Sequence, residues 1–383
     1  MKKNLIKGGK VFNSETSSFE NKDIFSDENI LQIAPPGKLS DKEKELNVID
    51  ARDCYIAPGF IDMHCHVFNH PLFRGQRLNA DRIGVEQGVA CLVDTGSAGP
   101  DTIDAFETFV INTQKTAVFA LVNIGSPGLP GIKGGHSSSP ELVSLSGAVR
   151  AVERHPDWIK GIKVLASASH SGMLGIEAVK IGRKAAQLTN TPLMVHLGNA
   201  PPVIEEVLDL LRPGDIVTHA YHGKIGGVLG YGGKIIPEFK AAVERGVIVD
   251  IAHGRSSFSF STCEKAIDQG MPVHTISSDL HMGNINRYVI SLARTMSKFR
   301  ALGLSLESVT DAVTRAPAQA LGLHTAGFGA IKEGGPTHLT LFRELDKEVE
   351  VEDAEGEKRM LHRWIEPHLV MIHGESFQPF QPL

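Results

Sequence analysis

Pro58-Gly-Phe-Ile-Asp-Met-His-Cys-His66 is a short apolar strand pattern that ends in two histidines two residues apart. Because residues i and i+2 of a β-strand face the same way, we expect His64 and His66 to point to one place and Cys65 to face the other side. Two neutral imidazoles at a strand end supply half of the ligands of a divalent-metal site. A His-x-His pair alone is more often incidental, so the rest of the chain has to decide.

From Pro58 onward, apolar segments alternate with loops and helical patterns. Eight segments have the pattern of buried strands: Ile61–His66, Ala90–Asp94, Val118–Asn123, Gly161–Ala166, Leu193–Leu197, Ile216–His219, Val247–His253 and His274–Asp279. Strands that alternate with helices pair in parallel and are apolar on both faces. The pattern predicts an α/β fold, a (β/α)8 TIM barrel over residues 58–323. An open doubly wound sheet remains the alternative.

The two ends of the chain have a different character. Residues 1–57 and 324–383 consist of short β-rich pieces separated by turn residues. Since both flank the barrel, we expect them to pair into one small, discontinuous β-sandwich domain. We expect the charged run 343–359 to be a solvated hairpin or loop.

Composition excludes several functional classes. The 383 residues include 39 Lys and Arg against 44 Asp and Glu without a basic block, so we expect no nucleic-acid partner. No apolar run is long enough to span a membrane, and no signal peptide is recognisable. The isolated cysteines, Cys54, Cys65, Cys91 and Cys263, favour a reducing compartment. We expect a cytoplasmic protein with a small-molecule substrate, and a homo-oligomer is compatible with the sequence.

Imidazole and charged side chains gather at the carboxyl ends of the predicted strands. They are His64 and His66 on the first strand, Lys163 on the fourth, His196 on the fifth, His219 on the sixth and Asp279 on the eighth. In a barrel these ends meet at one mouth. A chain with 17 histidines places some there by chance, but the joint placement predicts a metal site.

Four imidazoles and one carboxylate exceed what one tetrahedral cation needs, yet two cations need a bridging anion. Lys163 can supply it, because a lysine whose pKa is lowered by burial is partly neutral and can add carbon dioxide to form a carbamate. The competing interpretation is a salt-bridging or snorkelling lysine, which is the commoner fate at a strand end.

This arrangement of ligands resembles the amidohydrolase superfamily with a carbamylated lysine and a binuclear metal centre. Further stretches resemble its deacetylase subgroup, often labelled dihydroorotase-like: Val93–Gly99, Leu211–His219, Asp250–Gly254, Thr275–His281 and Thr295–Phe299. The resemblance covers nearly the whole chain. It implies a metal-dependent hydrolase of a linear amide or ester, such as an N-acetyl amino acid or an O-acetyl hydroxy acid.

The resemblance also implies roles for the ligands. One cation is held by His64, His66 and Asp279, the second by His196 and His219, and carbamylated Lys163 bridges the two. We expect two divalent metal ions, with zinc as the expected metal, although other divalent cations accept the same ligands. Asp279 is implied as the catalytic base and then acid beside a metal-bridging hydroxide.

Substrate recognition is where the resemblance becomes thin. Leu165 stands where the subgroup commonly has an arginine, and the loop 125–136 also departs from the usual form. As substrate-binding residues we predict His222, His253 and Arg255, because they follow the sixth and seventh strands; a solvated loop is the competing interpretation for Arg255. His281 and Arg287 are weaker candidates. The Gly223–Gly233 segment, with six glycines, is expected to be a mobile lid or a tight loop.

Two other functions stay open. Cyclic amide hydrolysis, as in dihydroorotase or hydantoinase relatives, uses the same metal centre. A hydrolase-like scaffold protein without chemistry is expected to lose ligands, and none of the six is missing here.

Overall fold

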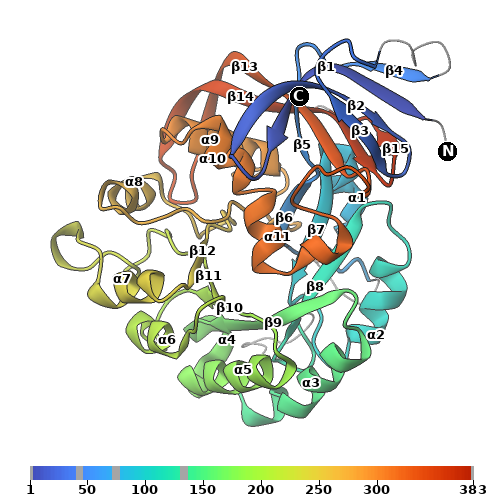
Figure 1. Ribbon diagram of the computed structural model, residues 1–383. Helices are drawn as coiled ribbons and strands as arrows, with labels where there is room; N and C mark the ends of the chain where they lie inside the picture. The colour runs from blue at the N-terminus through green and yellow to red at the C-terminus, as the bar shows by residue number, and fades with distance from the viewer. Residues whose placement is uncertain (1–2, 40–45, 71–77, 130–136, 381–383) are drawn as a thin grey trace.

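The computed structural model describes residues 3–39, 46–70, 78–129 and 137–380, and two sheets organise them. The first sheet has seven strands in the order β12-β11-β10-β9-β8-β7-β6, all parallel, and curls with its helices on the outside (Figure 1). Its strands are β6 (Phe60–Cys65), β7 (Val89–Thr95), β8 (Ala117–Asn123), β9 (Ile159–Ala166), β10 (Leu193–Leu197), β11 (Ile216–Thr218) and β12 (Ile248–Asp250). They coincide with the first seven predicted strands within a few residues.

The eighth predicted strand, His274–Asp279, is not a strand in the structure. The segment bridges the two edges of the sheet, through Thr275 to Asp250 of β12 and through Leu280 to Cys65 of β6. Asp279 has φ 52°, a left-handed conformation that a strand cannot continue through. The described residues therefore form a curled seven-stranded sheet whose edges are joined by isolated bridges.

Helices of the layer around this sheet are mostly short. They are α1 (Ala80–Ile83), α2 (Ile103–Phe106), α3 (Leu145–Arg154), α4 (Ala168–Ser171), α5 (Ile176–Thr189), α6 (Ile204–Leu210), α7 (Pro237–Glu244), α8 (Phe260–Asp268), α9 (Leu292–Ala301), α10 (Leu306–Asp311) and α11 (Arg315–Ala320). Close packing needs small residues. A Cβ on Gly182 of α5 would lie 2.3 Å from Cγ2 of Val164, so this glycine lets α5 approach the strand that carries Lys163.

Helix α9 shows how the sequence forms these elements. Ser291 caps its first turn, because the Ser291 hydroxyl accepts from the backbone N–H of Arg294 at 3.0 Å. Seven of its ten residues are buried, including Ser297 and Lys298. The hydroxyl of Ser297 donates to the carbonyl of Ala293 at 2.8 Å, as buried polar groups require a partner.

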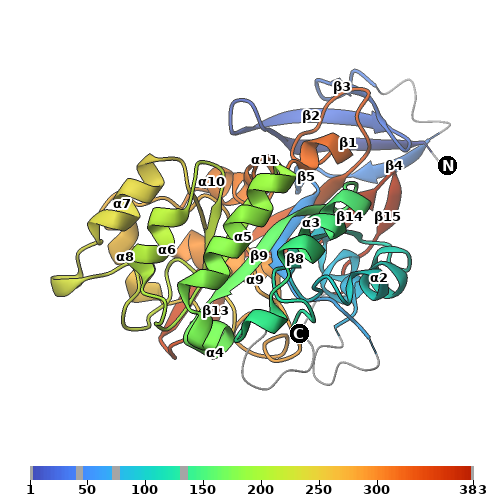
Figure 2. The ribbon, with the colours of Figure 1, turned by 90° about the horizontal axis from the view of Figure 1, so that it is seen from below.

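The second sheet joins both ends of the chain. Its order is β15-β14-β13-β5-β1-β2-β3, and β4 pairs with β1. The strands are β1 (Asn4–Asn13), β2 (Ser18–Ser26), β3 (Ile30–Ala34), β4 (Asn47–Asp50), β5 (Tyr55–Pro58), β13 (Leu339–Glu352), β14 (Lys358–Ile372) and β15 (Glu375–Phe377). The antiparallel pair of β5 with β13 links the two termini, and Figure 2 shows β1, β2 and β3 on one side of the helical layer.

A sandwich has two facing sheets, whereas the described residues at the two termini form one eight-stranded sheet with its own apolar cluster. The division of the chain at residues 57 and 324 stays a prediction. The charged run 343–359 lies in the β13–β14 hairpin, and the prediction of a solvated segment fails at Glu344, whose carboxylate pairs with Arg300 of α9 at 2.5 Å. Within the described ranges, no helix combines the length and the apolar composition needed to cross a membrane.

Candidate metal centre

All six predicted ligands line one cavity of about 220 Å³ at the carboxyl ends of the parallel strands. His64 lies near the end of β6 and His66 follows it, Lys163 lies on β9, His196 lies on β10, and His219 follows β11. Asp279 comes from the segment that bridges the sheet edges. The cavity is completed by Leu129, Leu165, His170 and His281.

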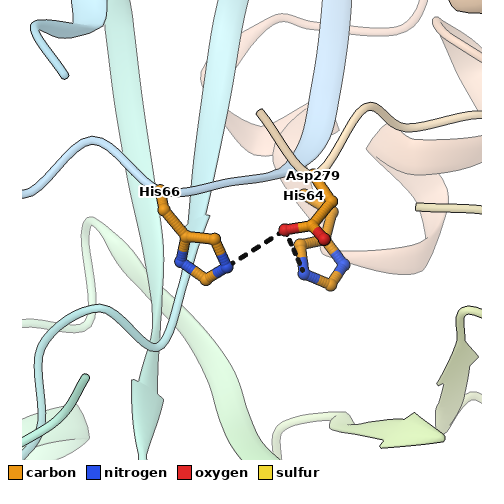
Figure 3. A group of neighbouring side chains, drawn as sticks. All are labelled: His64, His66 and Asp279. Carbon is orange, nitrogen blue, oxygen red and sulfur yellow. Dashed lines mark ion pairs between the residues drawn. The ribbon is translucent and has the colours of Figure 1, made fainter. Parts of the chain in front are cut away.

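Three of these side chains converge on one point, as Figure 3 shows. Oδ1 of Asp279 lies 3.2 Å from Nε2 of His66 and 3.8 Å from Nε2 of His64. One donor atom from each residue lies within 4.8 Å of the others, which is the spacing of a group that can share a cation.

The outer nitrogens of His64 and His219 are held by hydrogen bonds, which turn the inner nitrogens of both rings toward the cavity. The hydroxyl of Thr218 donates to Asp250 at 2.7 Å and lies 2.9 Å from Nδ1 of His64, which therefore donates to it. Nδ1 of His219 donates to the carbonyl of Ala252 at 2.7 Å. Both rings thus keep a lone pair on Nε2, as metal-ligating histidines do.

Backbone strain ends the strands at the cavity. His219, Ala252 and Asp279 have φ 63°, 41° and 52°, in the left-handed region that few non-glycine residues adopt. Such conformations cost of the order of 1–3 kcal/mol each and cluster at functional sites. They explain why β11 stops before His219, where a longer strand was predicted.

Protonation states also suit metal binding. Burial lowers the pKa of His219 to about 3, so its ring is neutral at pH 7. Burial alone raises the pKa of Asp279, but the hydrogen bond with His66 and the nearby imidazoles lower it to about 2. A neutral imidazole and an ionised carboxylate are the forms that bind a cation.

Lys163 is only 1% exposed, and burial lowers its pKa to about 7. Its Nζ lies 3.3 Å from Nε2 of His64 and 3.4 Å from Sδ of Met194. Among the described residues it makes no ion pair with a carboxylate within 4.0 Å. A buried lysine with no described carboxylate within ion-pair distance neither snorkels nor forms a salt bridge, so the commoner interpretation does not apply here.

Known proteins resemble this chain in sequence and in structure. No protein-family model matches it. A crystal structure of a dihydroorotase is 30% identical, with a TM-score of 0.88, and the match covers 99% of both chains. A crystal structure of an adenine deaminase is 31% identical, with a TM-score of 0.89, over 98% of this chain and 99% of that one.

The relatives found by sequence point to one subgroup, because they are named deacetylases. A deacetylase of Brucella anthropi is 33% identical over 349 residues, 90% of this chain and 85% of that protein. A deacetylase of Enterococcus faecalis is 33% identical over 326 residues, 84% of this chain and 86% of that protein. The chain belongs to the deacetylase subgroup of the amidohydrolase superfamily. It is a metal-dependent hydrolase that acts on carbon–nitrogen bonds.

The substrate-binding residues predicted for this amidohydrolase are not brought to the cavity. In the described part of the chain, none of the three is among the lining residues. His222 is buried, and its Nδ1 accepts from the backbone N–H of Lys224 at 3.1 Å. His253 binds Lys298 instead, and Arg255 is exposed. The strands end before these residues in left-handed turns, which redirect the side chains that an extended strand would have aimed at the mouth.

Two other histidines of this amidohydrolase do line the cavity, namely His170 and His281. The ring of His170 lies 5.6 Å from that of His196, and the ring of His281 lies 6.4 Å from that of His66. The backbone N–H of Gly283 donates to Nδ1 of His281 at 3.0 Å, so Nε2 carries the proton as a hydrogen-bond donor. Much of the unusual loop 125–136 lies outside the described residues.

Sequence reasoning also missed two glycines that make room for the ligands. A Cβ on Gly96 would lie 2.8 Å from Cγ of Lys163, and one on Gly254 would lie 2.4 Å from Oδ2 of Asp279. Both have positive φ, 85° and 57°. Both stand inside stretches that resemble the family, Val93–Gly99 and Asp250–Gly254, so a signal for them was present in the sequence.

Proposed function

We propose that this amidohydrolase removes an acyl group, preferably acetyl, from a small carboxylic acid, as an N-acetyl amino acid or an O-acetyl hydroxy acid. The observation that carries the proposal is the single small cavity on which all six predicted ligands converge. Relatives named deacetylase match this chain over most of its length, which favours a linear substrate over a cyclic amide.

The walls of the cavity fit such a substrate. Leu129 and Leu165 supply an apolar surface for the methyl end of an acetyl group. On the polar side, His281 presents an N–H donor that suits the carboxylate of the leaving acid. The volume of about 220 Å³ favours small substrates.

We assign one divalent cation to His64, His66 and Asp279 and a second to His196 and His219, with carbamylated Lys163 between them and zinc as the metal. The buried, partly neutral amine of Lys163 supports the carbamate. When bound, two such cations would lower the pKa of a water enough to supply a hydroxide nucleophile near neutral pH and would polarise the scissile carbonyl.

Asp279 is placed to move the proton. Its carboxylate is ionised at neutral pH and lies 3.2 Å from Nε2 of His66, within the group of His64, His66 and Asp279 that can share a cation. It accepts a proton during attack and then delivers it to the leaving nitrogen or oxygen, first as general base and then as general acid. Gly254 leaves room for this carboxylate, because a Cβ at that position would lie 2.4 Å from Oδ2 of Asp279.

The test compares substrate classes on the zinc-loaded enzyme. We expect kcat/KM to be highest for N-acetyl amino acids or O-acetyl hydroxy acids, tested as both stereoisomers, and lower for dihydroorotate and hydantoins. The variant Asp279→Asn should lose most of kcat for the preferred substrate. A higher kcat/KM for a cyclic amide would replace this proposal with the cyclic alternative. Well under one bound metal per chain after purification without chelators, with no turnover of either class, would favour the scaffold alternative.

A further inference from the structure

Lys298 is a fully buried lysine that the proposed reaction does not use. It lies on α9 within Thr295-Met-Ser-Lys-Phe299, and its exposed fraction is 0%. Its Nζ has three acceptors, Nε2 of His253 at 2.6 Å and the carbonyls of Tyr288 and Glu352 at 2.8 Å each. Three acceptors match the three N–H groups of an ammonium, whereas a neutral amine has only two. The site is thus built for the charged form.

The partner His253 is fixed in one tautomer by this contact. Its Nε2 accepts from Lys298, and its Nδ1 donates to the carbonyl of Gly254 at 2.9 Å. The ring also packs on that of Phe258, with centroids 4.8 Å apart and an angle of 34° between the planes. The side chain of His253 therefore holds the backbone of its own turn, Ala252–Gly254, through the carbonyl of Gly254.

That turn touches two of the predicted ligands. The carbonyl of Ala252 accepts from Nδ1 of His219 at 2.7 Å. The Cα of Gly254 packs against the carboxylate of Asp279, where a Cβ would come within 2.4 Å of Oδ2. Because Ala252 and Gly254 both have positive φ, the turn needs contacts that hold it in place.

The other acceptors of Lys298 tie the turn to distant parts of the chain. Glu352 is the last residue of β13, and the adjoining Asp353 accepts from the backbone N–H of Phe260 at 2.8 Å. Tyr288 lies in the segment between Asp279 and α9 and has φ 63°. One ammonium thus joins the hairpin of the small sheet, this segment and the turn after β12.

We propose that Lys298 is a positioning residue of the active site, which acts through His253 to hold the Ala252–Gly254 turn against His219 and Asp279. Lys298 does not touch the substrate. Without its N–H donors, His253 can change tautomer or rotate, and the carbonyl that orients His219 moves with the turn. Loss of such an outer partner typically costs about 10–100-fold in activity or metal affinity.

The test is a double-mutant cycle with a conservative control. Lys298→Met keeps the apolar stem, His253→Phe keeps the ring on Phe258, and His253→Gln places an amide oxygen near the position of Nε2. We expect either of the first two variants to lower kcat about tenfold or more with KM within about twofold. The double variant should lose no more than the larger single loss, and His253→Gln should retain a larger share of kcat than His253→Phe.

A second measurement needs neither substrate nor metal, so its outcome is separate from that of the proposed function. Nitrogen NMR of the metal-free protein should show His253 as the Nδ1–H tautomer. Its ring nitrogen signals are assigned by their loss in His253→Gln. In Lys298→Met these signals should shift. A folded Lys298→Met that keeps the His253 signal and kcat within about twofold of the parent would overturn the proposal. So would losses that multiply in the double variant, because Lys298 would then act independently of His253. If Lys298→Met does not fold, the His253→Phe and His253→Gln pair decides.

Discussion

Two buried lysines, Lys163 in the cavity and Lys298 behind it, share almost the same burial and differ in what surrounds the amine. Burial lowers the pKa of each to about 7. Lys298 has three acceptors within 2.8 Å, while the nearest partners of Lys163 are a ring nitrogen at 3.3 Å and a thioether sulfur at 3.4 Å. A thioether is a weak acceptor, so the residues that the structure describes offer Lys163 no full set of acceptors for an ammonium.

The difference shows that burial does not by itself decide what a lysine does. At Lys298 three good acceptors favour the protonated form of the amine, which fixes structure. At Lys163 no carboxylate of the described residues lies within 4.0 Å, and no comparable set of acceptors favours the ammonium, so the partly neutral amine is available to react. The two environments therefore predict different responses to the same Lys-to-Met substitution: the larger loss of kcat at Lys163 and the larger loss of stability at Lys298.

The largest expected effect is on turnover when the amine in the cavity is removed. Lys163→Met should lower kcat by more than about a hundredfold, the upper end of what loss of an outer partner costs, because the bridging ligand itself is lost. Steady-state kinetics with metal analysis on the same samples measures it. Lys160→Met, on the same strand with Nζ bound to the carbonyl of Pro156, is the matched control and should keep kcat. Full activity of Lys163→Met would show that Lys163 is no ligand.

A smaller loss of activity is expected when Lys163 is displaced without being removed. Gly96→Ala would place a Cβ 2.8 Å from Cγ of Lys163, so kcat should fall about tenfold. Gly214→Ala is the control, because Gly214 has nearly the same φ, 84° against 85°, and no heavy atom within 4 Å of the added Cβ. Both variants should lose about 1 kcal/mol of stability from backbone strain. Equal kcat values for the two would mean that the position of Lys163 does not depend on Gly96.

The stability of the fold should respond at the other lysine. Lys298→Met leaves the carbonyls of Tyr288 and Glu352 without their donor, so the free energy of unfolding should fall by about 1–3 kcal/mol. The free energy of unfolding of metal-free Lys163→Met should not fall below that of the parent, because the substitution removes a buried amine that lacks good acceptors. Urea unfolding of the two metal-free variants beside the parent checks this. If the two variants lost equal stability, the contrast between the lysines would not hold.

The sequence predicted one of these lysines and not the other, and the reason is geometric. Strand ends in parallel sheets share one edge, so Lys163 and Asp279 could be placed together from their positions alone. The contact between Lys298 and His253 joins a helix to a turn 45 residues away, and no periodicity encodes it. The sequence also did not predict the left-handed backbone of His219, Ala252 and Asp279. Local preference favours extended strands at these positions, and tertiary contacts override that preference.

The smallest effect, taken per pH unit, is expected in the pH dependence of stability at Lys163. Its pKa is about 7 in the folded chain and 10.5 in the reference state, so between these values the unfolded chain binds a proton that the folded chain lacks. The free energy of unfolding of the metal-free parent, relative to Lys163→Met, should therefore rise with pH across this window, by at most about 1.4 kcal/mol per pH unit. Below pH 7 both states are protonated, and the difference should be flat. Urea unfolding at several pH values measures it, and the other titrating groups cancel in the difference. A difference that stays constant from pH 7 to 10 would mean that Lys163 keeps its ammonium when buried, and the neutral amine that carbamate formation requires would then be absent.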